Sequence, residues 1–239
     1  MTLPEGPALI GVVEATWPPA RATRLGPWTI RDGRGGGQRV AATTAEAPVI
    51  AADLVAAERA MAELDQPSLF MIRPGEGVLD ALLEASGYRI KDPVALYAIE
   101  TTQLTDGPLP PVSAFHIWPP LAIMADLWAA GGIGPGRLAV MDRAEAPKTA
   151  ILARQKDQPA GAAFVACAGD IAMIHAIEVT PPLRRHGVGA NILRAAAHWA
   201  QDRGARFLTL AVTRENGPAN ALYASLGMQV VGQYHYRIK

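Results

Sequence analysis

Several residue types are scarce in this sequence, and each scarcity excludes a class of protein. Cys167 is the only cysteine, which rules out an intrachain disulfide and a cysteine-based metal cluster. No apolar run approaches the roughly eighteen residues of a membrane-spanning helix, and the start of the chain lacks the basic and apolar regions of a secretion signal. We therefore expect a protein of the reducing cytoplasm with no membrane partner.

An excess of charge of either sign is also missing. Lysine and arginine together number 22, as do aspartate and glutamate, so the balance favours neither nucleic acid nor an anionic membrane as a partner. The five histidines show no metal-ligand spacing, and we expect no metal. What the chain does have is apolar side chains, which make up 50% of its residues and suffice for a globular core.

Hydrophobic periodicity predicts a mixed α/β protein. Helical spacing marks residues 51–64, 78–86, 119–130 and 189–203. Strands are expected at 28–31, 39–43, 68–72, 88–100, 137–142, 149–155, 160–168, 171–179 and 207–212. Residues 8–17 fit either a short helix or a strand. Short turns join the strands between 137 and 179, so the expected fold is a mixed, mostly antiparallel central sheet flanked by helices.

Two stretches rich in glycine or proline interrupt this pattern. Gly33 to Gly37 lies between two expected strands, and with no helix expected directly after it we favour a hairpin tip over a phosphate loop. Residues 101–112 have the proline-rich composition of a linker. We therefore expect two domains, residues 1–105 and residues 113–239.

The two halves contain similar segments. Residues 82–88 (LLEASGY) align with residues 222–228 (LYASLGM), and Ala95 to Glu100 then aligns with Tyr234 to Lys239. The first half could be a degenerate copy of the second, although any amphipathic helix that ends in glycine would align as well. Leu83 stands where the second half has Tyr223.

A strand, a loop and a helix meet between residues 171 and 203. Pro181 and Pro182 end the strand, because proline cannot donate a hydrogen bond to a sheet. In the loop, Arg184 supplies donors, while Gly187 and Gly189 let a ligand approach the backbone. The helix that follows directs its free N–H groups and positive dipole end at the same point. This arrangement predicts an anion site, suited to phosphate.

The loop and a later motif resemble one family. Arg184-x-x-Gly187-x-Gly189 fits neither the dinucleotide fingerprint nor the Walker loop, but it resembles the coenzyme A pyrophosphate loop of the GCN5-related N-acetyltransferase (GNAT) superfamily. The run from Asn216 to Met228 is similar to the helix of that superfamily whose asparagine and tyrosine face the coenzyme, with methionine in place of the usual phenylalanine. The resemblance covers about residues 114–239, and the repeat extends it to tandem GNAT proteins that have one degenerate half.

This resemblance implies a GNAT fold in each half, acetyl-coenzyme A as the acyl donor, and residues that bind it. In the superfamily the strand before the loop splays from its neighbour, and its backbone hydrogen-bonds the pantetheine arm. The cofactor-binding residues implied here are Ile177, Val179, Arg184, Arg185, His186, Gly187, Val188, Gly189, Ala190, Asn216 and Ala219. Asn216 could instead cap its helix, since asparagine is favoured at that position.

Transfer of an acyl group from a thioester to an amine needs a base for the amine and an acid for the departing thiolate. Tyr223 matches the tyrosine of the superfamily that lies near the sulfur and acts as the acid. His175 and Glu178 are rival bases, and water without a dedicated base is a third reading. Strand alternation puts Glu178 on the face opposite to His175 and Ile177, unless a bulge reverses it. Cys167, in an apolar strand, is not expected to act as a nucleophile.

The sequence therefore predicts an N-acetyltransferase that moves an acetyl group from acetyl-coenzyme A to a primary amine of a small molecule or peptide, by direct attack in a ternary complex. Alternatives are a non-catalytic acyl-coenzyme A-binding or regulatory protein, and a first half that binds another protein. The run from Tyr234 to Arg237 could line the acceptor pocket or simply be an alternating strand. Both a monomer and a homodimer are compatible with the residues.

Overall fold

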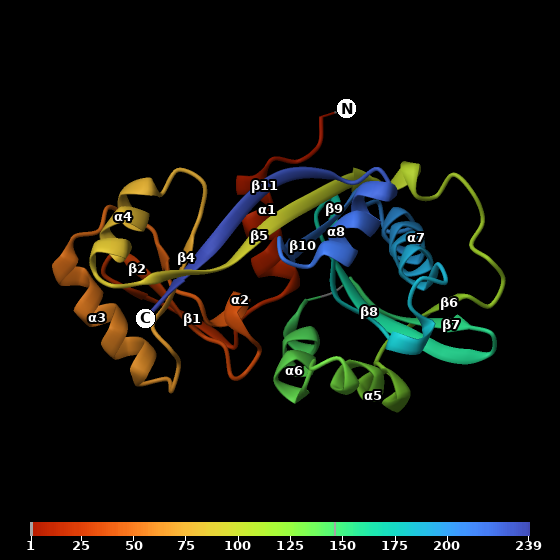
Figure 1. Ribbon diagram of the computed structural model, residues 1–239, viewed down its shortest axis with the longest axis horizontal. Helices are drawn as coiled ribbons and strands as arrows, with labels where there is room; N and C mark the ends of the chain where they lie inside the picture. The colour runs from red at the N-terminus through yellow and green to blue at the C-terminus, as the bar shows by residue number, and fades with distance from the viewer. Residues whose placement is uncertain (1, 146) are drawn as a thin grey trace.

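The computed structural model describes residues 2–145 and 147–239, and within them one long sheet runs through the molecule (Figure 1). Its eight strands lie in the order β4-β11-β5-β10-β9-β8-β7-β6, beside a three-stranded sheet ordered β1-β2-β3. Neighbours in the long sheet are antiparallel except for β9 and β10, which are parallel. The predicted mixed, mostly antiparallel sheet flanked by helices is confirmed.

The second half of the chain covers its part of the sheet on both faces. Its elements are β6 (Ala114–Ile117), α5 (Ala122–Ala130), α6 (Pro135–Arg143), β7 (Lys148–Gln155), β8 (Gln158–Ala168), β9 (Ile171–Val179), α7 (Val188–Gln201), β10 (Phe207–Thr213), α8 (Gly217–Ser225) and β11 (Gln229–Ile238). The buried stripe of α7, which includes Ile192 and Trp199, packs on one face, and α5 and α6 pack on the other. Each such apolar side chain that is buried stabilises the fold by about 1.5–3 kcal/mol.

The first half is built around smaller elements. They are α1 (Gly6–Thr16), β1 (Arg21–Leu25), β2 (Trp28–Asp32), α2 (Gln38–Ala41), β3 (Thr44–Ala45), α3 (Ala51–Ala62), β4 (Leu69–Ile72), α4 (Gly77–Ala85) and β5 (Arg89–Glu100). Residues 8–17, for which the sequence allowed a helix or a strand, lie mostly in helix α1. This helix packs against β8, β9 and β11 of the second half. No helix in the described residues has both the length and the apolarity to cross a membrane.

The two halves exchange strands. β5 of the first half lies between β10 and β11 of the second, and β11 lies between β4 and β5 of the first (Figure 1). The register is symmetric: Arg89, which begins β5, pairs with Ile238, and Gln229, which begins β11, pairs with Ala98. If Arg89 and Gln229 are equivalent, then Val94 is equivalent to Tyr234, and these two residues also pair with each other across the strands. The predicted alignment of Ala95 with Tyr234 is therefore wrong by one residue.

The helices before the exchanged strands end in the same way. The N–H groups of Gly87 and Tyr88 donate to the carbonyls of Glu84 and Leu83, and those of Gly227 and Met228 donate to Ala224 and Tyr223. Both glycines have positive φ, 86° and 81°, as a left-handed helix end requires. The repeat read from the sequence is thus a structural repeat, and Leu83 is the counterpart of Tyr223.

Two local expectations were wrong, and one short strand was missed. Residues 137–142 form part of helix α6 and not a strand: Pro135 occupies the first turn of the helix, where its missing N–H costs nothing, and the helix buries Val140 and Met141 together. Residues 39–43 are not a strand either, because helix α2 follows the glycine run directly, so that run is not a hairpin tip. The short edge strand β6 was missed, since its four residues have no pronounced alternation.

Candidate functional site

β9 and β10 are paired over only part of their length. Their pairing ends at Met173 and Thr209, whereas β9 continues to Val179 and β10 to Thr213. On its other edge β9 stays paired with β8 as far as Val179. One backbone edge of β9 therefore lacks a strand partner where the two strands diverge, as the resemblance implied.

The backbone groups that face this opening follow from the pairing on the other side. Glu178 pairs with Ala162, and the N–H of Thr180 donates to the carbonyl of Ala160 at 2.9 Å. Successive residues of a strand direct their backbone groups to opposite edges. The N–H and C=O groups of Ile177 and Val179 therefore point into the opening.

A β-bulge changes the side-chain pattern at this place. The register with β8 shifts between His175 and Glu178, and Ala176 between them has φ 51°. The carbonyl of Ala176 accepts a hydrogen bond from Trp128 Nε1 at 2.8 Å, which helps to hold this uncommon conformation. The bulge brings Glu178 to the same face as His175, which is the reversal that a bulge was expected to cause.

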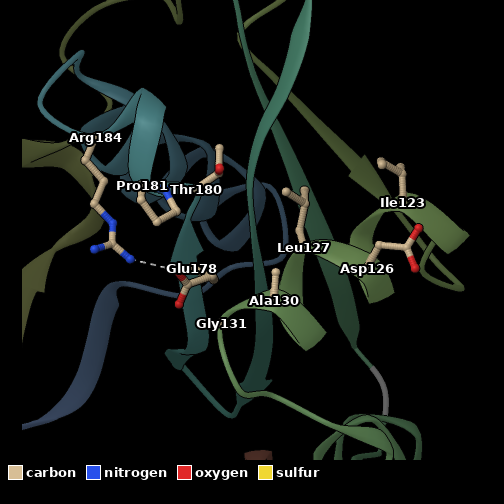
Figure 2. A pocket seen from close by; sticks show the side chains of 9 residues that line it. All are labelled: Ile123, Asp126, Leu127, Ala130, Gly131, Glu178, Thr180, Pro181 and Arg184. Atoms are coloured by element: carbon tan, nitrogen blue, oxygen red, sulfur yellow. Dashed lines mark hydrogen bonds and ion pairs between the residues drawn. The ribbon is translucent and has the colours of Figure 1, made fainter.

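Glu178 borders a cavity of about 440 Å³ between β9 and helix α5. Figure 2 shows Glu178 and Arg184 on one side of the cavity and residues of α5 on the other. The residues that line it are Ile123, Asp126, Leu127, Ala130, Gly131, Glu178, Thr180, Pro181 and Arg184. A partly apolar cavity with a carboxylate at its edge has room for a substrate next to the diverging strands.

Arg184 folds back over the end of β9. Its Nε donates to the carbonyl of Val179 at 2.9 Å. Its Nη2 donates to Glu178 Oε1 at 3.1 Å (Figure 2). The side chain of Arg184 is 56% exposed and that of Glu178 17%. Ion pairs this open to water are worth about 0–1 kcal/mol, so a ligand can displace the guanidinium at little cost.

The loop ends at the N-terminus of α7. Gly187, the residue before the helix, has φ 81°, no side chain caps the helix there, and its first turn has no acidic residue. The N–H groups of Val188, Gly189 and Ala190 have no intrahelical acceptor because they belong to the first turn. Backbone donors and the positive end of the dipole thus face the loop.

The remaining loop residues lie at its surface. Arg185 is exposed with φ 66°, and the exposed His186 has its Nδ1 2.8 Å from the carbonyl of Arg184, to which it donates. Gly189 has a second purpose that the sequence did not show. A Cβ at this position would lie 2.8 Å from Leu222 Cδ2, so glycine allows α7 and α8 to pack closely.

His175 is buried and is not among the residues that line the cavity between β9 and α5. Arg39 Nη1 donates to its Nδ1 at 3.0 Å, so the ring proton is assigned to Nε2, which lies 2.8 Å from Thr16 Oγ1. Its ring stacks on that of Trp17. Burial, with a contribution from the Arg39 charge, lowers the pKa of His175 well below its ordinary value. Both nitrogens are occupied and the imidazole is neutral.

Tyr223 lies in the apolar cluster against which Ile177 and Val179 also pack. Its ring meets that of Tyr97 edge-on, and no described residue hydrogen-bonds its hydroxyl. Burial, with a smaller contribution from Tyr97, raises the pKa of Tyr223 to about 12. The hydroxyl therefore stays protonated at neutral pH and is free to donate.

Asn216 caps helix α8. Its side-chain oxygen accepts a hydrogen bond from the N–H of Ala219 at 3.2 Å, which satisfies one of the free donors of the first turn. Asn220, which sequence reasoning missed, links this helix to Tyr97 through a 3.0 Å hydrogen bond. No signal in the sequence marked Asn220, Trp128 or Arg39, because their roles depend on contacts between distant segments.

Comparison with known proteins agrees with this geometry. Residues 121–228 match the acetyltransferase (GNAT) family. A stretch of 63 residues is 36% identical to the uncharacterized N-acetyltransferase YobR of Bacillus subtilis (strain 168), and the match covers 26% of each chain. The chain therefore spans only about a quarter of that relative's length.

Solved structures match over nearly the whole chain. A GCN5-related N-acetyltransferase from Kribbella flavida superposes with a TM-score of 0.72 at 19% identity, over 97% of this chain and 94% of that one. A tandem GNAT protein from the clavulanic acid biosynthesis pathway does so with a TM-score of 0.62 at 14% identity, over 97% and 87%. Both share the fold. The second half of this chain, with its diverging strands and open helix N-terminus, is therefore similar in sequence to the acetyltransferase (GNAT) family, and the whole chain shares the fold of solved GNAT proteins.

Proposed function

We propose that the protein transfers an acetyl group from acetyl-coenzyme A to a primary amine. The observation that carries this proposal is the free backbone edge of β9, which leads directly to the open N-terminus of α7. The edge offers hydrogen bonds to the amides of a pantetheine arm, much as another strand would. The helix N-terminus then receives the pyrophosphate.

Binding of the coenzyme rearranges Arg184 in this proposal. The carbonyl of Val179, which the pantetheine needs, accepts from Arg184 in the structure. When the coenzyme takes that carbonyl, the guanidinium turns toward the phosphates and leaves the Glu178 carboxylate. The donor substrate thus frees the carboxylate that the reaction needs.

No described group of three or more histidine, cysteine, aspartate or glutamate residues is placed to hold a metal ion.

Glu178 and Tyr223 then divide the proton transfers. Glu178 accepts a proton from the amine, whose nitrogen attacks the thioester carbonyl carbon. The backbone N–H of Val179 stabilises the oxyanion. As the C–N bond forms and the C–S bond breaks, Tyr223 protonates the departing thiolate. Glu178 is favoured over His175 as the base because it borders a cavity, whereas His175 is buried with both nitrogens occupied.

Direct attack is favoured over an acyl-enzyme because the chain offers no activated thiol. Cys167 is the only cysteine, and burial raises its pKa to about 11. At neutral pH the thiol is therefore protonated, and a protonated thiol is a poor nucleophile. The protein must therefore bind acetyl-coenzyme A and the amine together in a ternary complex.

Calorimetric titration tests the central point. Acetyl-coenzyme A and coenzyme A should bind, while NAD and ATP should bind weakly or not at all. Release of free thiol with a panel of amines then tests turnover. If neither form of coenzyme A binds, the proposal is wrong.

A second candidate is a protein that binds acyl-coenzyme A without turnover. The ion pair between Arg184 and Glu178 favours it, because the guanidinium occupies a carboxylate oxygen that would otherwise accept the proton of the amine. The two candidates differ in one measurement. Binding of acetyl-coenzyme A without thiol release for any amine would support the second.

A further inference from the structure

A smaller cavity of about 210 Å³ lies where the two halves of the chain meet. It borders the separated ends of β9 and β10, since one residue beyond the paired part of each strand lines it. The residues that matter here are Gln38 and Arg39 from α2, Asp92 from β5, Arg137 from α6, Ala176 from β9 and Thr213 from β10. The first half of the chain therefore supplies part of a cavity next to the proposed acetyl site.

The glycine run explains how α2 comes to this position. A Cβ on Gly36 would lie 2.5 Å from Val140 Cγ2, and one on Gly136 would lie 2.4 Å from the carbonyl oxygen of Gly35. Only glycine allows the loop and helix α6 to approach this closely. The run therefore joins the two halves, and α2, which follows it, presents Gln38 and Arg39 to the cavity.

Arg39 has a charge that the protein leaves unbalanced. Its Nη1 donates to His175, and the hydroxyls of Tyr234 and Tyr236 are its other polar neighbours. No carboxylate of the described residues lies within ion-pair distance of the guanidinium, and its Nε is buried without a partner. An unpaired buried charge is costly, and arginine does not lose its proton. The guanidinium of Arg39 therefore lacks an anionic partner, although the carboxylate of Asp92 lines the same cavity.

Gln38, in turn, has a hydrogen-bond acceptor without a donor. Its Nε2 donates to Asp92 Oδ2 at 2.7 Å, which fixes the orientation of the amide and engages the carboxylate of Asp92. The Oε1 atom of Gln38 is then buried without a donor. A second cation, Arg137, lies against Gly37, with its Nε 3.4 Å from where a Cβ would be. The cavity thus has two guanidiniums and an acceptor that still needs a donor.

We propose that this cavity binds the carboxylate of the acceptor, so that the acceptor is a small amine that also carries a carboxylate, such as an amino acid. Arg39 and Arg137 pair with the carboxylate, and Gln38 accepts from an N–H group of the same molecule. The volume suits a group of this size and not a folded peptide segment. The amine then lies at Ala176 and Thr213, beside the diverging strands, and Ala176 is two residues before Glu178, the proposed base, on β9.

This inference rests on the proposed acetyl transfer, and it also assigns a purpose to the first half. His175 becomes a positioning residue, because its Nδ1 and its stacking on Trp17 hold the guanidinium of Arg39 in place. The first half then selects the acceptor, while the second half binds the donor. The two sites meet at the bulge of β9.

The test is calorimetric titration of the protein, loaded with coenzyme A, with each standard amino acid and its matched carboxamide. Phosphoethanolamine is included as a phosphate-bearing amine. At least one acid should bind about tenfold or more tightly than its amide, since a charge-assisted pair is lost in the amide. Arg39→Gln and Arg137→Gln should each remove that preference while the affinity for coenzyme A stays unchanged.

Arg24→Gln, a change on the exposed strand β1, is the matched control and should keep the preference. Arg137 lies at the surface, so its variant keeps the test valid even where Arg39→Gln fails to fold. The inference is overturned if no acid binds better than its amide, if phosphoethanolamine alone binds, or if the preference survives Arg137→Gln. Coenzyme A binding, measured separately, shows whether the proposed function itself stands.

Discussion

The openings between parallel strands in the two halves differ in what fills them. In the second half, β9 and β10 diverge and leave a free backbone edge. In the first half, Thr43 and Phe70 form the matching parallel bridge, and Arg73 occupies the space beyond it. Arg73 donates to the carbonyl of Ala45 and forms ion pairs with Glu46 and Glu76. The chain's own side chains thus take the place that a ligand would need.

The helices that follow these openings differ in the same sense. In α3, the carboxylate of Asp53 accepts the N–H of Ile50 at 3.0 Å, so an anion already sits at the helix N-terminus. In α7 the corresponding position is Ala190 and the first turn has no acidic residue. With Leu83 in place of Tyr223, the first half has lost each feature that the second half keeps. The two halves therefore share one backbone plan, and a few side chains fill the opening in the first half and leave it free in the second.

The largest effect is expected from the carboxylate beside the opening of the second half. Glu178→Gln should lower kcat by about 10²–10⁴, the usual contribution of a general base, with little change in the affinity for acetyl-coenzyme A. Glu76→Gln, which removes the carboxylate paired with Arg73 in the first half, is the matched control and should leave kcat near that of the wild type. Equal rates for the two variants would show that the halves do not differ in this way.

The next effect concerns the tyrosine that the first half lacks. Tyr223→Phe removes only the hydroxyl, so kcat should fall by about 100-fold while the dissociation constant of acetyl-coenzyme A stays the same. Tyr88→Phe removes a hydroxyl bonded to Glu58 in the first half and should not alter kcat. A normal rate for Tyr223→Phe would mean that Tyr223 serves packing alone, as Leu83 does.

A smaller effect should follow from giving α7 the acidic residue of α3. Ala190→Asp places a carboxylate where Asp53 stands in α3, and its charge opposes the phosphates at the positive end of the helix. The affinity for coenzyme A should fall about tenfold, while the melting temperature holds or rises because the helix gains a cap. Ala190→Asn supplies a neutral cap, and this variant should bind coenzyme A with normal affinity. Similar losses for both variants would point to crowding as the cause.

The smallest effect concerns the contact between the halves. Because the pKa of His175 is lowered in the folded protein, the unfolded chain binds more protons at this site below its ordinary value of about 6.5. The free energy of unfolding should therefore fall as pH drops below about 6.5, by at most about 1.4 kcal/mol per pH unit from this group.

Chemical denaturation between neutral and mildly acidic pH measures this dependence. His175→Asn removes the titrating group, so its free energy of unfolding should fall less steeply with decreasing pH. His186→Gln, a change at an exposed loop residue, should follow the wild type. If the free energy of unfolding of His175→Asn falls with decreasing pH as steeply as that of the wild type, then His175 is not a neutral imidazole that accepts a hydrogen bond from Arg39.

Much of the second half could be read directly from the sequence. The strand that ends before Pro181, the loop from Arg184 to Gly189 and the amphipathic stripe of α7 are encoded by neighbouring residues, so their pattern identifies them. The repeat between residues 82–88 and 222–228 was also visible, because both helices need glycine at the same place. Local signals of this kind do not depend on distant contacts.

Other features could not be predicted because they depend on which segments meet. Short apolar runs suit helix and strand equally, and residues 137–142 form a helix that buries Val140 and Met141 in an apolar cluster with residues from distant segments. His175 was a candidate base by its position in β9, yet Arg39, from a segment far away in the chain, occupies its Nδ1.

The sequence by itself determined the family motifs, the strand-loop-helix segment and the repeat, since each is a spacing along the backbone. The tertiary structure alone decided the exchange of β5 and β11, the bulge that turns Glu178 toward the face of His175, and the cavity between the halves. The physical reason is burial. Whether a charge is paired, a hydroxyl free or a carboxylate accessible depends on the atoms that distant segments bring around it.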